Sequence, residues 1–218
     1  MRDGFGTFRR AAAGEAEQVF DLIRQRIAWM DERGIQQWNH PGYLRRYPLD
    51  YFRQCAEEGQ LYALWTECGA LAAGAVVLEE DPRWAGYGGK ALYVHNLAAS
   101  LHFSGAGTEL LRRCLALAAE RGQDYLRLDC ARDNPVLHDY YERFGFRFVA
   151  PVEDQGYLGD LLQYPLGSRD GAGRRHRKDQ KEGLSQWEKS SRSPARWWWP
   201  PGSRRPTWPT WSGWASRA

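Results

Sequence analysis

The sequence predicts an α/β fold in which helices pack on a mixed β-sheet. Segments with the two-residue period of strands and the 3.6-residue period of helices alternate along residues 1–166. Two adjacent apolar segments, 61–67 and 71–78, are joined at Cys68-Gly69, which is typical of an antiparallel hairpin. An apolar run that begins at Leu92 breaks into a short glycine loop and continues as a helix. Alternation of this kind predicts layers of helix against sheet.

The first 60 residues predict one strand and two helices. Phe5 to Arg10 can form the strand. The first helix ends before Gly34, and its apolar stripe consists of Ala16, Val19, Phe20, Ile23, Ile27 and Met30. Residues 35–47 predict an irregular segment with large amphipathic side chains, and Pro48 and Gly59 bracket a second, shorter helix.

A glycine loop lies in the middle of the chain. A long loop, residues 79–90, leads into a strand over 91–97, and after the glycine loop a helix runs from about Thr108 to near Gly122. The free N–H groups and the positive dipole end of that helix would face an anion, most naturally a phosphate. The same residues also fit an ordinary tight turn between two core elements.

The next strand carries charged residues on one face. Over 125–130, Leu126, Leu128 and Cys130 alternate with Tyr125, Arg127 and Asp129. Asn134-Pro135 then begins a helix, and Gly145 ends it. Segments 146–149 and 161–166 are plausible closing strands.

Composition divides the chain into a domain over residues 1–166 and a tail over 167–218. The domain holds 18 Lys and Arg against 23 Asp and Glu, whereas the tail holds 12 against 4. The tail is rich in Arg, Ser, Gly, Pro and Trp and has no periodicity, so we expect it to be disordered. A role of this tail in binding nucleic acid is the less favoured alternative.

The four cysteines lie far apart, and no histidine stands at metal-ligand spacing. We therefore expect reduced, mostly buried thiols and no metal site. No apolar run approaches the roughly 20 residues that span a bilayer, and the N-terminus lacks a signal-peptide core. These features predict a cytoplasmic protein without a membrane partner.

Four segments together resemble the GNAT N-acetyltransferase superfamily. They are YVHNLAA before the glycine loop, LLRRCLALAAERG after it, YLRLDCARDNP in the next strand, and LHDYYERFGFRF in the last helix. The resemblance runs from about Phe5 to Leu166. It implies a mostly antiparallel central sheet with helices on both faces. It also implies transfer of an acetyl group from acetyl-coenzyme A to a primary amine, which is a small molecule or amino-acid-like.

The resemblance also implies a binding site for the cofactor. The glycine loop would bind the pyrophosphate, and the strand end would offer backbone hydrogen bonds to the pantetheine arm. Asn134 would orient that arm or only cap its helix. The implied contacts are Leu97, Ala98, Ala99, His102, Ser104, Gly105, Ala106, Gly107, Thr108, Asn134 and Tyr141.

Two side chains have implied roles in the chemistry. Tyr141 stands where similar enzymes carry the tyrosine that protonates the coenzyme A sulfur, although its apolar helix face also fits the core. Asp129 matches a carboxylate that takes a proton from the amine through water. Arg127, two residues away on the same strand face, makes a structural ion pair with Asp129 an equal alternative.

The acceptor cleft would be bordered by the loop after the third strand. Glu79, Glu80 and Asp81 would supply carboxylates there, and the aromatic walls would be Trp38, Tyr43, Trp84 and Tyr87, together suiting a cationic amine. The alternative for this loop is a solvated acidic turn. His95 is favoured slightly for a cleft position over a purely structural one.

The glycine loop departs from the pattern of the family. His102 stands where the family has Arg or Gln, or, if the loop is aligned differently, Ser104 takes that position. About two residues are missing between the strand end and the helix. The rival interpretation is therefore a non-catalytic protein of the same fold with a degenerate coenzyme A loop. The oligomeric state is left open, a homodimer included.

Overall fold

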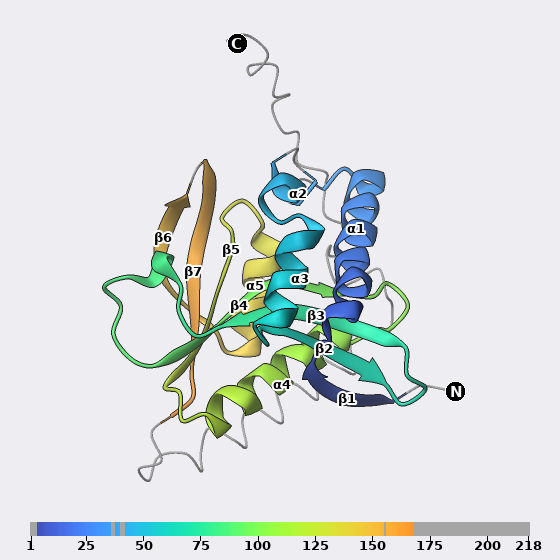
Figure 1. Cartoon of the computed structure of the whole chain (residues 1–218). Helices are drawn as coiled ribbons and strands as arrows, with labels where there is room; N and C mark the ends of the chain where they lie inside the picture. Colours follow the sequence, from blue (N-terminus) through green and yellow to red (C-terminus); the bar gives the residue numbers. More distant parts are fainter. Residues whose placement is uncertain (1–3, 36–37, 40–41, 155, 168–218) are drawn as a thin grey trace.

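A seven-stranded sheet forms the centre of the molecule (Figure 1). The computed structural model describes residues 4–35, 38–39, 42–154 and 156–167. In chain order the strands are β1 (Phe5–Arg10), β2 (Leu61–Thr66), β3 (Leu71–Leu78), β4 (Ala91–Ala99), β5 (Tyr125–Ala131), β6 (Arg147–Asp154) and β7 (Tyr157–Pro165). Across the sheet the order is β1-β2-β3-β4-β5-β7-β6. Only β4 and β5 pair in parallel, so the predicted mixed, mostly antiparallel sheet is confirmed.

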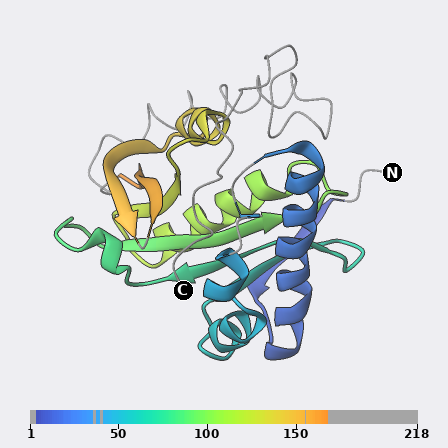
Figure 2. The ribbon, with the colours of Figure 1, turned by 90° about the horizontal axis from the view of Figure 1, so that it is seen from above.

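Helices cover both faces of this sheet (Figures 1 and 2). The helices are α1 (Ala16–Arg33), α2 (Tyr43–Arg46), α3 (Leu49–Glu57), α4 (Ala106–Glu120) and α5 (Pro135–Phe144), with short 3-10 turns η1 (Ala13–Glu15) and η2 (Pro82–Trp84). One core lies between the sheet and α1 with α3, and a larger core lies between the other face and α4 with α5. None of the helices in the described ranges is both long and apolar enough to cross a membrane.

The helix ends follow from local chemistry. Gly34 ends α1 in the left-handed conformation, at φ 62°, which costs glycine little. At the start of α5, the Asn134 side chain accepts a hydrogen bond from the Leu137 N–H, and Pro135 occupies the first helical turn. Gly145 ends that helix at φ 114°. The predicted end of α1 and both predicted ends of α5 are confirmed.

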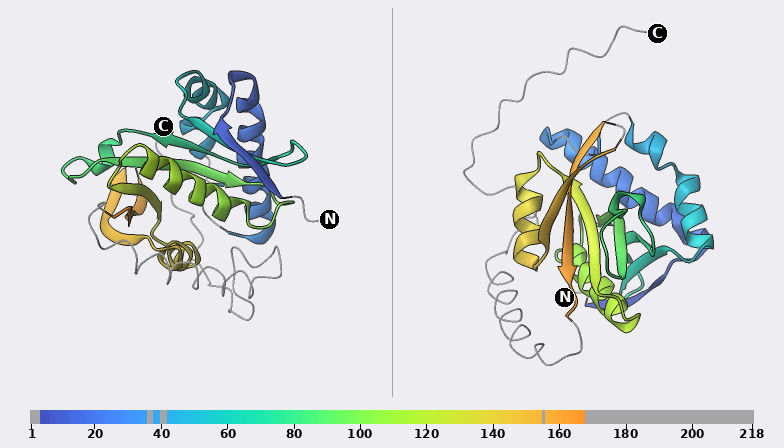
Figure 3. Two further views of the ribbon diagram at one scale, coloured as in Figure 1. Left: turned by 90° about the horizontal axis from the view of Figure 1, so that it is seen from below. Right: turned by 90° about the vertical axis from the view of Figure 1, so that its left-hand side faces the viewer.

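Long-range pairing extends the closing strands beyond their predicted bounds. β6 continues to Asp154, and β7 starts at Tyr157, because Val152 pairs with Gly159 and Asp154 with Tyr157 across the hairpin. Figure 3 shows this hairpin with α5 beside it. The segment that was expected to be irregular contains the short helix α2. Helix α4 begins two residues before the predicted start, at Ala106.

A β-bulge interrupts β4 at Asn96. Asn96 has φ 51°, and it is the one non-glycine residue with positive φ among the described residues. The register with β3 shifts by one here, since His95 faces Val76 whereas Ala98 faces Gly74. The amide of Asn96 donates to the Tyr43 hydroxyl at 2.8 Å, which ties the bulge to α2. The bulge therefore lies where strand β4 approaches α2.

Candidate functional site

Strands β4 and β5 separate after a short parallel ladder. They pair only from Ala91 with Tyr125 to Tyr93 with Arg127, although β4 runs on to Ala99. On its other edge β4 stays paired with β3 as far as Ala99. Within the described strands, the β5-facing edge of β4 beyond Tyr93 thus has no ladder partner. That edge is where the resemblance places backbone contacts from Leu97, Ala98 and Ala99.

The first turn of α4 lies just past the end of β4. Gly105 precedes the helix at φ 88°, a conformation that favours glycine. The first i to i−4 hydrogen bond of the helix runs from the Glu109 N–H to the Gly105 carbonyl, at 2.9 Å. The N–H groups of Gly107 and Thr108 precede that bond, at the positive end of the helix dipole. The predicted loop from Ser104 to Thr108 therefore has the geometry of an anion site.

Thr108 ties this turn to the last helix. Its Oγ1 lies 3.2 Å from the Tyr140 hydroxyl. Burial raises the pKa of Tyr140 to about 12, partly offset by this hydrogen bond, so the phenol is protonated at neutral pH. The bond joins α4 to α5 on the larger core side of the sheet.

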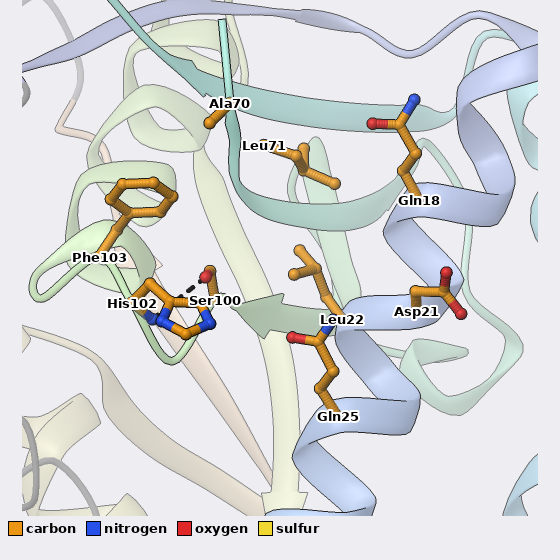
Figure 4. A pocket seen from close by; sticks show the side chains of 9 residues that line it. All are labelled: Gln18, Asp21, Leu22, Gln25, Ala70, Leu71, Ser100, His102 and Phe103. Atoms are coloured by element: carbon orange, nitrogen blue, oxygen red, sulfur yellow. Dashed lines mark hydrogen bonds between the residues drawn. The ribbon is translucent and has the colours of Figure 1, made fainter. Parts of the chain in front are cut away.

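His102 lies toward α1 rather than in the first turn of α4. Together with Ser100 and Phe103 it lines a hollow of about 450 Å³ whose other walls come from α1 and the β2–β3 turn (Figure 4). The His102 N–H donates to Ser100 Oγ at 3.2 Å. The hollow contains neither Tyr141 nor Asp129, so it is separate from the residues with implied chemical roles.

Tyr141, on helix α5, is buried in the larger core. Its ring packs edge-on against Phe146, at a centroid distance of 5.5 Å. Its pKa is raised well above the ordinary value, mainly by burial and to a smaller extent by the nearby Cys130 and Asp129. The phenol is therefore a hydrogen-bond donor at neutral pH, and both the core role and the acid role predicted for it agree with this position.

Asp129 is paired with Arg83, not with Arg127. Arg83 Nη1 lies 3.0 Å from Asp129 Oδ1, and the Tyr157 hydroxyl hydrogen bonds to the same carboxylate. The expected ion pair between Asp129 and Arg127 is therefore wrong. Asp129 pairs with Arg83 instead, because η2 brings this residue of the 79–90 loop to the strand. The side chain of Asp129 is 12% exposed and that of Arg83 is 16% exposed, so both reach the surface of the site.

His95 completes this cluster. Arg83 Nη2 lies 2.9 Å from His95 Nδ1, and a guanidinium can only donate. His95 Nδ1 therefore accepts this hydrogen bond. On the other side of the ring, His95 Nε2 lies 3.0 Å from Asp81 Oδ2. The structure thus places His95 in contact with Asp81 and Arg83, largely buried.

Asp81 remains ionised in this cluster. Burial opposes its charge, but contacts with His95 and with the Arg83 N–H and guanidinium outweigh burial and lower the pKa to about 2. Asp81, His95 and Asp129 bring one ligand atom each within 4.8 Å of one another. The Arg83 guanidinium lies among these atoms, at 3.4 Å from Asp81 Oδ1, and supplies the positive charge that a metal ion would supply.

The comparisons with known proteins identify the family. The sequence matches the model of the acetyltransferase (GNAT) family over residues 23–146. The chain belongs to this family. It is also 30% identical over 154 residues to a Bacillus subtilis protein named as an uncharacterized N-acetyltransferase, YesJ, which covers 66% of this chain and 82% of that relative.

Solved structures support the same fold. A GNAT-family acetyltransferase from Listeria monocytogenes superposes with a TM-score of 0.62 and 27% identity, covering 74% of this chain and 94% of the other. The PaiA N-acetyltransferase of Thermoplasma acidophilum, solved with coenzyme A, superposes with a TM-score of 0.57 over 73% of this chain and 98% of the other. At 14% identity, that second likeness shows the fold alone.

The predicted acceptor residues of this GNAT chain do not converge. Glu79 is exposed and pairs at 2.8 Å with Arg121, the residue that follows α4. Trp84 is buried against Tyr93, and Tyr87 makes an edge contact with Trp84 at the loop surface. Trp38 lies elsewhere and stacks on Tyr43, at 5.4 Å between ring centroids. Of this group, only Trp38 contacts a residue bonded to the β4 bulge.

Arg127 has a different role from the one expected. Its guanidinium is buried over the Trp84 ring, 4.6 Å from the centroid, and donates to the Gly88 carbonyl at 2.6 Å and the Tyr93 hydroxyl at 3.2 Å. These contacts hold the 79–90 loop against β5. Because that loop carries Asp81 and Arg83, Arg127 positions the cluster indirectly.

Sequence reasoning missed Arg83 and Tyr157 as site residues. Asp81-Pro82 carries a signal for a short turn, since the Asp81 side chain accepts from the Arg83 N–H at 2.9 Å. No comparable signal marks Tyr157, which reaches Asp129 through strand pairing. Asn134 caps α5, as one of its two predicted roles requires.

Proposed function

We propose that this GNAT chain is an acetyl-CoA-dependent N-acetyltransferase that transfers the acetyl group directly to a primary amine. The observation that carries the proposal is the separation of β4 from β5. It leaves a backbone edge on β4, with the first turn of α4 beyond it. Asp129 belongs to β5, one of the two strands that separate, and Tyr141 belongs to α5, the helix that follows this strand.

The residues around the opening fit coenzyme A. The N–H groups of Gly107 and Thr108 would hold the pyrophosphate, and the backbone of Leu97 to Ala99 would hold the pantetheine arm. When bound, the cofactor supplies an activated acetyl thioester. Among the relatives, the PaiA enzyme was solved with coenzyme A, which supports this assignment by analogy of fold.

Tyr141 would donate the proton that the departing thiolate needs. Its raised pKa keeps the phenol protonated, and Asp129 would receive the proton of the amine through water. Arg83 and Tyr157 fix the orientation of the Asp129 carboxylate. Burial raises the pKa of Cys130, so this neighbouring thiol is a poor nucleophile, which favours direct transfer over an acyl-enzyme.

Calorimetry with acetyl-CoA and a thiol-release assay with primary amines test the proposal. We expect saturable binding and amine-dependent release of coenzyme A. Tyr141→Phe should lower kcat by about 10- to 100-fold with little change in cofactor affinity. Tyr125→Phe, at the far end of β5, is the matched control.

Two results would contradict this function. Absence of binding at millimolar acetyl-CoA would favour the rival interpretation, a non-catalytic protein with a degenerate loop. An unchanged rate in Tyr141→Phe would remove that residue from the mechanism while leaving the reaction in place.

A further inference from the structure

We infer that the acceptor is a primary amine without an acidic group next to its amino group, rather than an amino acid. This inference rests on the proposed function and names its substrate class. Its basis is the charge and aromatic content of the cluster formed by Asp81, Arg83, His95, Asp129 and Tyr157, called the acceptor-side cluster below.

The acceptor-side cluster carries a surplus negative charge. Two carboxylates face one guanidinium, with Arg83 at 3.0 Å from Asp129 and 3.4 Å from Asp81. His95 Nδ1 accepts a hydrogen bond from Arg83 at 2.9 Å, which helps to hold the guanidinium between the two carboxylates. An ammonium group that approaches Asp129 is therefore attracted, whereas a carboxylate in the same place is repelled.

The cations near the cluster are already paired. Arg83 is paired with Asp81 and Asp129, and Arg46, whose guanidinium lies 5.8 Å from the centre of the Tyr47 ring, forms an ion pair with Asp154. An acceptor carboxylate would have to displace Asp129 or Asp154 to gain a guanidinium partner. Displacement would leave a half-buried carboxylate without its cation, which costs free energy.

Aromatic side chains on the same side complement a cation. The Tyr43 hydroxyl accepts a hydrogen bond from Asn96, the residue after His95 on β4, and the Tyr47 ring lies beside the Arg46 guanidinium. The Tyr43 and Tyr47 rings are tilted against each other at 5.1 Å, and Trp38 stacks on Tyr43. Burial raises the pKa of Tyr43, so its phenol is neutral at physiological pH. Neutral phenols and π faces stabilise an organic cation and offer nothing comparable to a carboxylate.

Matched pairs of acceptors test the inference directly. Thiol release is measured at saturating acetyl-CoA with tyramine against tyrosine, cadaverine against lysine, and agmatine against arginine. Each pair differs by one carboxylate. We expect kcat/KM to be at least about tenfold higher for the decarboxylated member of the pairs that react.

A variant that changes one charge tests whether electrostatics set the preference between the two members of each acceptor pair. A purely structural effect would leave this preference unchanged. Asp154→Asn frees Arg46 for an incoming carboxylate, so the preference for the decarboxylated amine should shrink by about tenfold. Asp139→Asn is the matched control, because Asp139 pairs with Arg143 on the exposed surface of α5. The control should leave the preference unchanged.

The outcomes separate this inference from the proposed function. Equal or faster acetylation of the amino acids overturns the inference and leaves the function standing. Binding of acetyl-CoA without acetylation of any panel amine also overturns it, since the named class is then not accepted. Failure of acetyl-CoA to bind at all overturns the proposed function instead.

Discussion

The ring of Tyr157 lies across the backbone of Gly159. A Cβ atom at position 159 would lie 2.6 Å from Tyr157 Cε1, closer than side chains tolerate. Gly159 pairs with Ala131 of β5, two residues after Asp129 on that strand. Glycine at this position therefore leaves the space through which Tyr157 reaches the Asp129 carboxylate.

Replacing this glycine should displace the tyrosine. We expect Gly159→Ala and Tyr157→Phe to lower kcat by similar factors, about tenfold, because both remove the hydrogen bond that orients Asp129. Circular dichroism should show a retained fold. Gly14→Ala is the control, since nothing lies within 4 Å of its added Cβ. Full activity in Gly159→Ala would show that Tyr157 does not orient Asp129.

Arg26 of α1 should control the loop that precedes α4. Its Nε donates to the Ala99 carbonyl at 2.7 Å, and its side chain is largely buried. Arg26→Met removes this donor and leaves the carbonyl unsatisfied, so we expect the KM for acetyl-CoA to rise about tenfold with a smaller change in kcat. Kinetics at varied acetyl-CoA measure this split. A fall in kcat with an unchanged KM would contradict a role of Arg26 in positioning the loop that precedes α4.

Arg127 should be a major determinant of stability. It is 2% exposed and holds the 79–90 loop through the Gly88 carbonyl and the Trp84 ring. Arg127→Lys cannot reproduce the paired donors, so the free energy of unfolding should fall by roughly 2–4 kcal/mol. Urea denaturation measures the loss. Arg24→Lys, at an exposed pair with Asp21, should change stability by less than about 0.5 kcal/mol.

Asp81 should make stability depend on pH in the acid range. Its pKa is lowered from about 3.8 to about 2 in the folded chain. Its contribution is therefore complete above about pH 4 and is lost as the pH falls toward 2. Wild type should exceed Asp81→Asn by on the order of 1–3 kcal/mol at pH 6, and the difference should vanish near pH 2. Urea midpoints from pH 2 to 6 test this, and a constant difference would contradict it.

Local chemistry explains how much of the fold could be predicted from the sequence. Asn134, Pro135 and Gly145 define α5 to the residue because capping and left-handed glycine are properties of adjacent residues. The limits of β6 and β7 depend instead on pairing across the hairpin, where Gly159 and Pro151 carry no strand signal of their own. The ends of β6 and β7 are therefore set by tertiary strand pairing and could not be predicted from the strand propensity of their residues.

The candidate site was predictable only where one segment carries it. The glycine loop and the first turn of α4 follow each other in the chain, so their geometry could be expected. The partner of Asp129 could not, because Arg83 and Tyr157 come from loop and strand segments far from position 129. Proximity on the same strand face favoured Arg127, whereas the aromatic rings of Trp84 and Tyr125 hold that guanidinium instead.

The bulge at Asn96 has a consequence for how insertions and deletions act on this strand. Tyr93 packs against Trp84 and His95 contacts Asp81 on one side of the sheet, yet Leu97 and Ala99, also odd-numbered, pack toward the core beneath α4. One extra residue therefore reverses the inside-to-outside alternation halfway along β4. Deleting a single residue here would turn Leu97 and Ala99 to the opposite face and pull both from under Gly107. Strand β4 thus tolerates substitution more readily than any change in its length.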